Sequence, residues 1–314
     1  MRQLFAFIAA ALLACSAAQA QKEPCAAAGN NNDFLGIQTI RLWPGDAPLA
    51  KGKACVDIPT LTVFESAGGG SGRGSAVIIM PSGGYSQLTG KAGREAADWF
   101  TARGFRAFVL SYRLSSHGYL MPAPLLDARR AVQLVRARAR EFQIDPNRIV
   151  VAGFSAGGHL AALSATQFVP GLPEAEDPIE RVSSRPDYLV LGYAWIGAFD
   201  SNTGYCKRFK TTDGCAALRA AYSPDLFVSK DTPPTFLYHT FNDEAVPVEQ
   251  GLRFYEALVK AGVPAEMHIF SNGPHGSGLG KGDPALDQWP NLMENWLRAQ
   301  GLLTPSKSVA GPKP

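Results

Sequence analysis

Short apolar runs alternate with longer amphipathic stretches along this sequence, and this alternation most restricts its fold. Six runs have the length of buried strands and are bounded by turn residues, at residues 75–80, 106–110, 149–153, 188–193, 235–239 and 265–270. Helical spacing fills residues 94–103, 125–142, 157–168, 247–261 and 286–300. The alternation predicts a mostly parallel sheet with helices on both faces. We expect residues 56–65 to add an antiparallel edge strand.

The first twenty residues differ from the rest of the chain. Arg2 precedes an apolar run over residues 4–14, and Ala18-Gln19-Ala20 has the small residues of a cleavage site. This pattern predicts an export signal, because the run is shorter than the roughly 17 residues that span hydrocarbon. A second route, lipoprotein anchoring at Cys15, is open because Leu12-Leu13-Ala14-Cys15 loosely matches such a processing site. We therefore expect a periplasmic or secreted protein.

Removal of residues 1–20 leaves a predicted domain over residues 21–303 and a flexible tail over residues 304–314. A second flexible connection is predicted at the glycine-rich residues 68–74. Four cysteines remain, Cys25, Cys55, Cys206 and Cys215. An even number in an oxidising compartment predicts two disulfides. Cys206 and Cys215 are close together in a predicted Gly/Thr/Asp-rich loop, which favours pairing them and pairing Cys25 with Cys55.

The charge of the chain does not indicate a nucleic-acid or membrane partner. Thirty Lys and Arg against 27 Asp and Glu leave a net charge of +3, which is too near balance for such a surface. The densest basic stretch, residues 129–140, has apolar residues at helical spacing, so we expect its arginines on a solvated face. After the signal, no stretch has the length and hydropathy of a membrane span. Small-molecule partners are expected, and the oligomeric state stays open.

A serine lies between a predicted strand and a predicted helix, in Gly153-Phe154-Ser155-Ala156-Gly157. In this context the G-x-S-x-G pattern is typical of a nucleophile elbow, because the glycines permit the tight turn that presents a serine hydroxyl at a helix N-terminus. A serine that only caps the helix is the alternative. That role does not require glycine on both sides, so Ser155 is predicted to be a nucleophile.

A serine nucleophile needs a general base and a group that orients this base. His275 follows the last predicted strand in a glycine-rich loop and is the best candidate base, whereas His159 in the elbow helix is expected to be packed or capping. Asp243 follows the preceding strand and is the candidate acid, with Glu244 as its competitor. The order serine, aspartate, histidine is that of α/β-hydrolases.

An acyl-transfer site also needs N–H donors for the oxyanion. Met80-Pro81-Ser82-Gly83-Gly84-Tyr85 leaves a predicted strand where esterases carry such a loop. The amides of Gly83, Gly84 and Ala156 are therefore the predicted oxyanion hole. Tyr85 and Trp195 are candidate substrate contacts through their rings; core packing is an equal alternative for Trp195.

Several further motifs together resemble one family, the secreted bacterial α/β-hydrolases similar to acetylxylan and feruloyl esterases, often labelled endo-1,4-beta-xylanase-like. They include Leu42-Trp43-Pro44-Gly45, Leu110-Ser111-Tyr112-Arg113-Leu114, Ile144-Asp145-Pro146 and the elbow through His159-Leu160-Ala161. The resemblance implies an α/β-hydrolase fold without metal or organic cofactor, in which Ser155, Asp243 and His275 are nucleophile, acid and base and Gly83 lies in the oxyanion loop. Ser82 replaces the first of the three glycines usual in that loop.

The expected function is a serine carboxylesterase acting on acetyl or feruloyl groups of plant-wall carbohydrate, with a small-molecule or oligosaccharide ester as substrate. Glycoside hydrolysis needs a pair of carboxylates that the sequence does not single out. A peptidase of the prolyl-oligopeptidase type and a general carboxylesterase or lipase are the alternatives. Residues 197–222 argue against a lipase, since they are polar and lack the apolar face of a lipid-binding lid.

Overall fold

The structure is a computed structural model that describes residues 34, 36–66, 74–200, 205 and 212–303. The predicted export signal, the tail over residues 304–314 and most of the glycine-rich connection lie outside these residues. Each predicted disulfide includes a cysteine, Cys25 or Cys206, that is also outside them. The pairing therefore stays a prediction.

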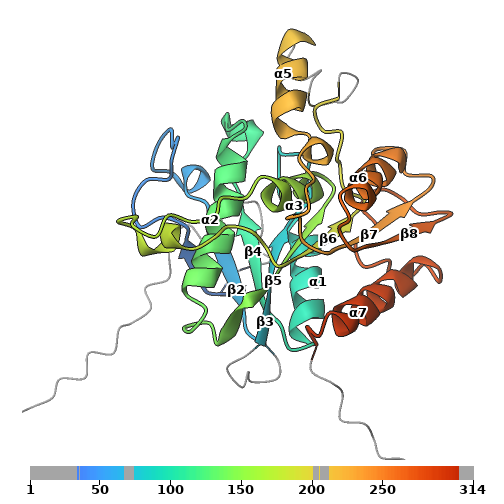
Figure 1. Cartoon of the computed structure of the whole chain (residues 1–314), viewed down its shortest axis with the longest axis horizontal. Helices are drawn as coiled ribbons and strands as arrows, with labels where there is room; N and C mark the ends of the chain where they lie inside the picture. Colours follow the sequence, from blue (N-terminus) through green and yellow to red (C-terminus); the bar gives the residue numbers. More distant parts are fainter. Residues whose placement is uncertain (1–33, 35, 67–73, 201–204, 206–211, 304–314) are drawn as a thin grey trace, which may run out of the picture.

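An eight-stranded sheet forms the centre of the molecule (Figure 1). Its strands are β1 (Thr39–Arg41), β2 (Thr60–Phe64), β3 (Gly74–Met80), β4 (Arg106–Ser111), β5 (Ile144–Phe154), β6 (Tyr188–Gly192), β7 (Thr235–Thr240) and β8 (Ala265–Phe270). Their order is β1-β2-β4-β3-β5-β6-β7-β8. The six strands from β4 to β8 pair in parallel, whereas β1 and β2 are antiparallel to their neighbours. The predicted mostly parallel sheet is confirmed.

The predicted antiparallel strand at residues 56–65 is confirmed in its antiparallel pairing, but its edge position and its bounds were wrong. Its strand part is β2, which lies inside the sheet because β1 pairs with its outer side. Residues 55–57 form a 3₁₀ turn, η2 (Cys55–Asp57), in which the Asp57 carboxylate accepts from the N–H of Ala54 at 3.0 Å. The three residues of β1 are too few to show an alternating pattern, so the sequence did not reveal them.

Helices cover both faces of the sheet, as predicted (Figure 1). They are α1 (Gly90–Thr101), α2 (Ala123–Ala137), α3 (Ala156–Thr166), α5 (Thr212–Tyr222), α6 (Glu249–Lys260) and α7 (Trp289–Ala299). Short 3₁₀ turns are η3 (Ser115–His117), η4 (Pro178–Arg181), η5 (Pro224–Leu226) and η6 (Leu286–Gln288). Buried side chains of α2, α3 and α6 pack on one face, and those of α1 and α7 pack on the other.

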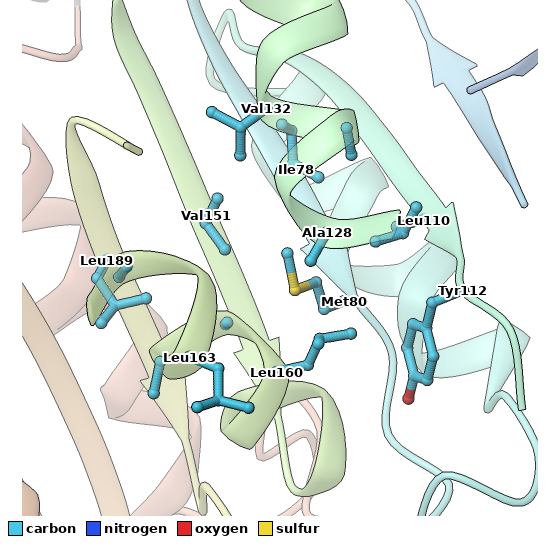
Figure 2. Close-up of a cluster of buried hydrophobic side chains, with 14 of the residues drawn as sticks. Ile78, Met80, Leu110, Tyr112, Ala128, Val132, Val151, Leu160, Leu163 and Leu189 are labelled. Carbon is cyan, nitrogen blue, oxygen red and sulfur yellow. The ribbon is translucent and has the colours of Figure 1, made fainter. Parts of the chain in front are cut away.

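The strand β3 shows how alternation builds two cores. Ile78 and Met80 point into the core beneath α2 and α3 (Figure 2), whereas Val77 and Ile79 face α1 and α7. All four side chains are fully buried. A strand buried on both faces reads as a continuous apolar run, which is the pattern seen at residues 75–80.

The prediction that the arginines of α2 form a solvated face was wrong for two of them. Arg130 is only 2% exposed; its Nε donates to the Leu42 carbonyl at 2.8 Å and it pairs with Asp177. Arg136 donates to the Pro146 carbonyl at 2.9 Å and pairs with Asp187. A long guanidinium arm can bury its stem and still donate to carbonyls and carboxylates. These two arginines therefore attach α2 to neighbouring segments.

The helix α5 was not predicted, and Cys215 lies in it, where the sequence suggested a loop. In Figure 1 this helix projects beyond the layers that enclose the sheet. No helix in the described part of the chain has the length and hydropathy needed to cross a membrane.

Candidate active site

Ser155 lies at the turn between β5 and α3 in a strained backbone conformation. Its φ of 53° and ψ of −121° are unfavourable for a side chain with a Cβ. The turn is held from both sides, because the Ser155 N–H donates to the Gly192 carbonyl at 3.1 Å and its carbonyl accepts from the Trp195 N–H at 3.0 Å. The Ser155 side chain makes no capping hydrogen bond to α3. This geometry agrees with an elbow and not with a capping serine.

The glycines on both sides of Ser155 are required by close packing. A Cβ on Gly153 would lie 2.3 Å from the carbonyl oxygen of Gly157. A Cβ on Gly157 would lie 2.1 Å from the carbonyl oxygen of Met80, at the end of β3. The second contact brings the elbow against the start of the loop that follows β3, which is the predicted oxyanion loop.

Ser155, His275 and Asp243 form one chain of hydrogen bonds. Ser155 Oγ lies 2.8 Å from His275 Nε2, and His275 Nδ1 lies 2.8 Å from Asp243 Oδ2. Because a carboxylate only accepts, Nδ1 carries the proton and Nε2 is free to accept from the serine hydroxyl. This is the arrangement by which a histidine activates a serine. The three residues come from the turns after β5, β7 and β8, so the predicted trio is brought together.

The Asp243 carboxylate is held by backbone N–H groups in addition to His275. Its Oδ1 accepts from the N–H groups of Ala245 and Val246 at 2.9 and 2.8 Å, and its side chain is completely buried. Glu244, the competing candidate, is exposed. His239 Nε2 lies 3.5 Å from Asp243 and donates to the Val246 carbonyl at 2.8 Å. Burial lowers the pKa of His239, which favours its neutral form beside the aspartate.

His275 is partly exposed to solvent, and the ring of Tyr193 packs against its imidazole. Its side chain is 26% exposed, and the ring of Tyr193 packs edge-on against it with centroids 5.1 Å apart. Tyr193 itself is buried in the core. A base that is held on one side and open on the other can reach both the nucleophile and an entering substrate.

Four carbonyl groups of the loop after β3 accept hydrogen bonds. The carbonyls of Pro81, Ser82, Gly83 and Tyr85 accept from Tyr112 Oη at 2.8 Å, Thr89 N at 3.1 Å, Gln87 N at 3.1 Å and Ser115 N at 2.8 Å, respectively. Within the described residues, the N–H groups of Gly83, Gly84 and Ala156 donate to no other group. Bonded carbonyls and unused N–H groups are the features expected of an oxyanion hole.

Gly83 and Gly84 differ in how strictly they must be glycine. Gly83 has a φ of 129°, and a Cβ there would lie 2.1 Å from the Gln87 carbonyl oxygen. Gly84 has a φ of 62°, but the space around its missing Cβ is nearly open. Ser82 is not among the residues with positive φ, and its Oγ lies 2.5 Å from Thr89 Oγ1. Serine therefore fits at this position, where the family usually has the first of its three glycines.

The two predicted substrate contacts are placed differently. Tyr85 is 1% exposed, and its hydroxyl meets His159 Nδ1 at 2.7 Å. Its ring therefore does not line an open cleft, which corrects the prediction that it meets the substrate. Trp195 is half-buried, and its backbone N–H donates to the Ser155 carbonyl. This position next to the nucleophile keeps Trp195 as a candidate contact.

Sequence reasoning missed the residues that hold the oxyanion loop. Tyr112 and Ser115 follow β4 and bond the loop carbonyls from the side. Tyr112 and Arg113 belong to the Leu110–Leu114 motif, so the family resemblance carried a signal for this region. Arg113 and Asp127 form a fully buried ion pair at 2.7 Å that anchors the same segment on α2. Burial raises the pKa of Asp127 to about 6, and the bonds from Arg113 oppose that rise.

Other features of the described residues stand apart from this trio. A cavity of about 310 Å³ lies between α2 and residues 169–180, and its wall includes Trp43 and Arg129 but none of the trio. No three His, Cys, Asp or Glu side chains in the described ranges are grouped so that they could hold a metal ion.

Comparisons with known proteins identify the family of this chain. The BD-FAE family matches residues 69–181, and the prolyl oligopeptidase family matches residues 188–300. The crystal structure of an acetyl ester-xyloside bifunctional hydrolase from Caldicellulosiruptor lactoaceticus is 38% identical, with a TM-score of 0.77, and the match covers 85% of this chain and 97% of that one. The chain belongs to the α/β-hydrolase esterases.

Other members of this esterase family are more distant or longer. An esterase from Thermogutta terrifontis, in a structure with bound propionate, is 28% identical with a TM-score of 0.69 over 87% of this chain and 98% of that one. An acetylxylan esterase from Xylanibacter ruminicola is 33% identical over 72% of this chain and 46% of its own length. The chain thus spans less than half the length of that curated relative.

Proposed function

We propose that this protein is a serine carboxylesterase that removes acetyl or feruloyl groups from plant-wall carbohydrate. One observation carries the proposal, the continuous chain from Ser155 Oγ through His275 to Asp243 with both distances at 2.8 Å. Geometry of this kind, together with free N–H donors nearby, supports acyl transfer through a covalent intermediate.

In the proposed reaction, Ser155 Oγ attacks the ester carbonyl carbon while His275 Nε2 takes the hydroxyl proton. The N–H groups of Gly83, Gly84 and Ala156 bind the oxyanion of the tetrahedral intermediate. The intermediate then breaks the bond to the alcohol oxygen, which receives the proton from His275. Water, deprotonated by the same histidine, then attacks the acyl-enzyme carbonyl. The bond from this carbon to Ser155 Oγ breaks, the acid is released, and Ser155 Oγ receives the proton from His275. Asp243 stabilises the imidazolium that forms in each step.

The names of related proteins support the substrate class. The Xylanibacter relative is an acetylxylan esterase, and the Caldicellulosiruptor protein acts on an acetyl ester. The Thermogutta esterase has been solved with propionate and with butyrate, both short acyl groups. Acetyl or small aryl esters are therefore the proposed substrates.

The test compares p-nitrophenyl esters from acetyl to octanoyl, together with release of acetate and ferulate from decorated xylan. We expect kcat/KM to fall with acyl length and acid to be released from xylan. The Ser155→Ala variant is the control for hydrolysis elsewhere in the preparation. A kcat/KM that rises steadily toward octanoyl, with no acid released from xylan, would contradict the substrate class.

Xyloside hydrolysis is a second candidate, because the Caldicellulosiruptor protein is described as bifunctional. Such chemistry requires two carboxylates beside the sugar bond, and both oxygens of Asp243 are already engaged. Assays of p-nitrophenyl xyloside with the wild type and Ser155→Ala separate the two activities. Xyloside cleavage that survives in Ser155→Ala would establish a separate site.

The prolyl oligopeptidase match over residues 188–300 includes Asp243 and His275 and favours a peptidase as a further candidate. A panel of peptide p-nitroanilides tests this activity. We expect no turnover at enzyme concentrations that hydrolyse p-nitrophenyl acetate within seconds.

We further propose that residues 1–20 direct export. N-terminal sequencing of the protein recovered outside the cytoplasm is expected to begin at Gln21. A lipid-modified N-terminus at Cys15 would instead establish the lipoprotein route.

A further inference from the structure

His159 joins three segments of the site through one buried side chain. It lies one turn after Ser155 on α3 and has no exposed surface. Its Nδ1 lies 2.7 Å from the hydroxyl of Tyr85, and its Nε2 lies 2.8 Å from the carbonyl oxygen of Tyr222, the last residue of α5. The oxyanion loop, the nucleophile helix and α5 therefore meet at this ring.

The two hydrogen bonds determine the state of the imidazole. A carbonyl only accepts, so Nε2 carries the proton and donates to Tyr222. Nδ1 is then an acceptor, and the Tyr85 hydroxyl donates to it. Burial lowers the pKa of His159 to about 4, and burial raises the pKa of Tyr85. Both groups are thus uncharged near neutral pH, and the direction of each hydrogen bond is defined.

Tyr85 ends a strained stretch of the oxyanion loop. Gly83, Gly84 and Tyr85 follow one another with φ values of 129°, 62° and 60°. A residue with a Cβ in this region costs about 1 to 2 kcal/mol and persists only where its surroundings hold it. Three hydrogen bonds hold Tyr85 here. Ser115 donates to its carbonyl from the backbone N–H at 2.8 Å and from Oγ at 3.0 Å, and the Tyr85 hydroxyl bonds to His159.

The ring of His159 is also enclosed by aromatic side chains. Phe199 packs edge-on at 5.3 Å and Tyr85 at 5.8 Å, measured between ring centroids. Tyr205 in turn packs against both Tyr85 and Phe199. This enclosure keeps water from competing for the bond between Tyr85 and His159.

We propose that His159 is a positioning residue for ester hydrolysis. Through Tyr85 it sets the oxyanion donors of Gly83 and Gly84 at a defined distance from Ser155. Through Tyr222 it links that setting to the position of α5. This inference rests on the proposed function, because it assigns a role to the oxyanion loop in that reaction.

Two substitutions at His159 separate its two hydrogen bonds. In His159→Asn, the side-chain oxygen takes the place of Nδ1 and can accept from Tyr85. In His159→Gln, the side-chain nitrogen takes the place of Nε2 and can donate to Tyr222, but the acceptor for Tyr85 is lost. Tyr85→Phe removes the same bond from the other side with the least change in shape, so it remains informative where a His159 variant does not fold.

The variants are compared by kcat and KM on p-nitrophenyl acetate, with the thermal unfolding midpoint as a check of folding. We expect kcat to fall about ten-fold in Tyr85→Phe and in His159→Gln, with KM within two-fold of wild type. His159→Asn is expected to keep kcat within about three-fold. The double variant Tyr85→Phe/His159→Gln should be no slower than either single variant, because each change removes the same hydrogen bond between residues 85 and 159.

A boronic acid inhibitor gives a readout that a purely structural role would leave unchanged. Its tetrahedral adduct with Ser155 uses the oxyanion donors, so its Ki is expected to rise by the same factor as kcat falls. An active wild type whose kcat and Ki are unchanged by Tyr85→Phe contradicts this inference alone. Equal losses of kcat in His159→Asn and His159→Gln, with Ki of the boronic acid unchanged in both, also contradict it. A folded wild type that hydrolyses no ester contradicts the proposed function as well.

Discussion

Two parts of the chain, called the first and the second half of the site below, position their residues differently. In residues 74–192 the proposed nucleophile and the proposed oxyanion donors are set by the backbone, with φ values of 53° at Ser155 and 129° at Gly83. In residues 235–275 the proposed acid and the proposed base are side chains after β7 and β8, held by hydrogen bonds at 2.8 to 2.9 Å. The first half should therefore be sensitive to added volume, and the second to the loss of a single polar atom.

Removing Ser155 or the central His275 of the hydrogen-bonded trio should have the largest effect on kcat and should erase the difference between the two parts. Ser155→Ala and His275→Ala are each expected to lower kcat on p-nitrophenyl acetate on the order of a million-fold, since the residues act as one unit. The double variant should be no slower than either single variant. A double variant that is far slower than both would show that the residues act separately.

Asp243→Asn tests the second half at its buried end. The amide can no longer hold the His275 tautomer, so kcat should fall by about 10⁴-fold while the fold is kept. Glu244→Gln is the matched control, because this neighbouring carboxylate is exposed. Its kcat is expected to stay within two-fold of wild type. A larger loss in Glu244→Gln than in Asp243→Asn would reverse the assignment of the acid.

Gly83→Ala and Gly84→Ala test the first half by adding one methyl group. At Gly83 the methyl carbon meets the Gln87 carbonyl at 2.1 Å, so the loop must move, and we expect kcat to fall about 100-fold. At Gly84 only the positive φ is unfavourable, and we expect a loss of about ten-fold or less. Equal losses would mean that backbone conformation, not contact with Gln87, controls the loop.

The pH dependence of stability tests the contact between the elbow helix and the oxyanion loop. His159 has a pKa of about 4 when folded, below its ordinary value of 6.5. Between these values the unfolded chain binds more protons, so the free energy of unfolding falls as the pH falls. From pH 7 to pH 4.5 the loss from this group is roughly 2 to 3 kcal/mol.

Urea unfolding of the wild type and of His159→Asn at both pH values isolates this effect. Asp127 titrates in the same window with the opposite sign, because burial raises its pKa to about 6, and it is common to both proteins. The wild type should lose more stability than the variant on acidification. An equal loss in both would mean that His159 is not held neutral by the fold.

The sequence predicted the trio because each member follows a buried strand within a local pattern. Ser155 has glycines on both sides, and Asp243 and His275 each follow a strand by a few residues. The contact between Tyr85 and His159 joins residues 74 positions apart inside the core, and no local pattern encodes it. Likewise β1 is too short to have a period, and Arg130 was placed on the wrong surface because its buried carbonyl partner, Leu42, lies 88 positions away. Long-range partners, which a single sequence does not reveal, account for the two missed contacts, and the short length of β1 accounts for the missed strand.

The contact between Gly157 and the end of β3 has a consequence for protein engineering. A Cβ at residue 157 would meet the carbonyls of Met80 and Pro81 at 2.1 and 2.4 Å, so the pentapeptide around Ser155 fits only beside a neighbouring strand that leaves the sheet in this way. Transplanting the pentapeptide alone into another parallel sheet would supply the serine without the loop that carries the proposed oxyanion donors. The transferable unit of this scaffold is the pair of adjacent strands β3 and β5 with both of their turns.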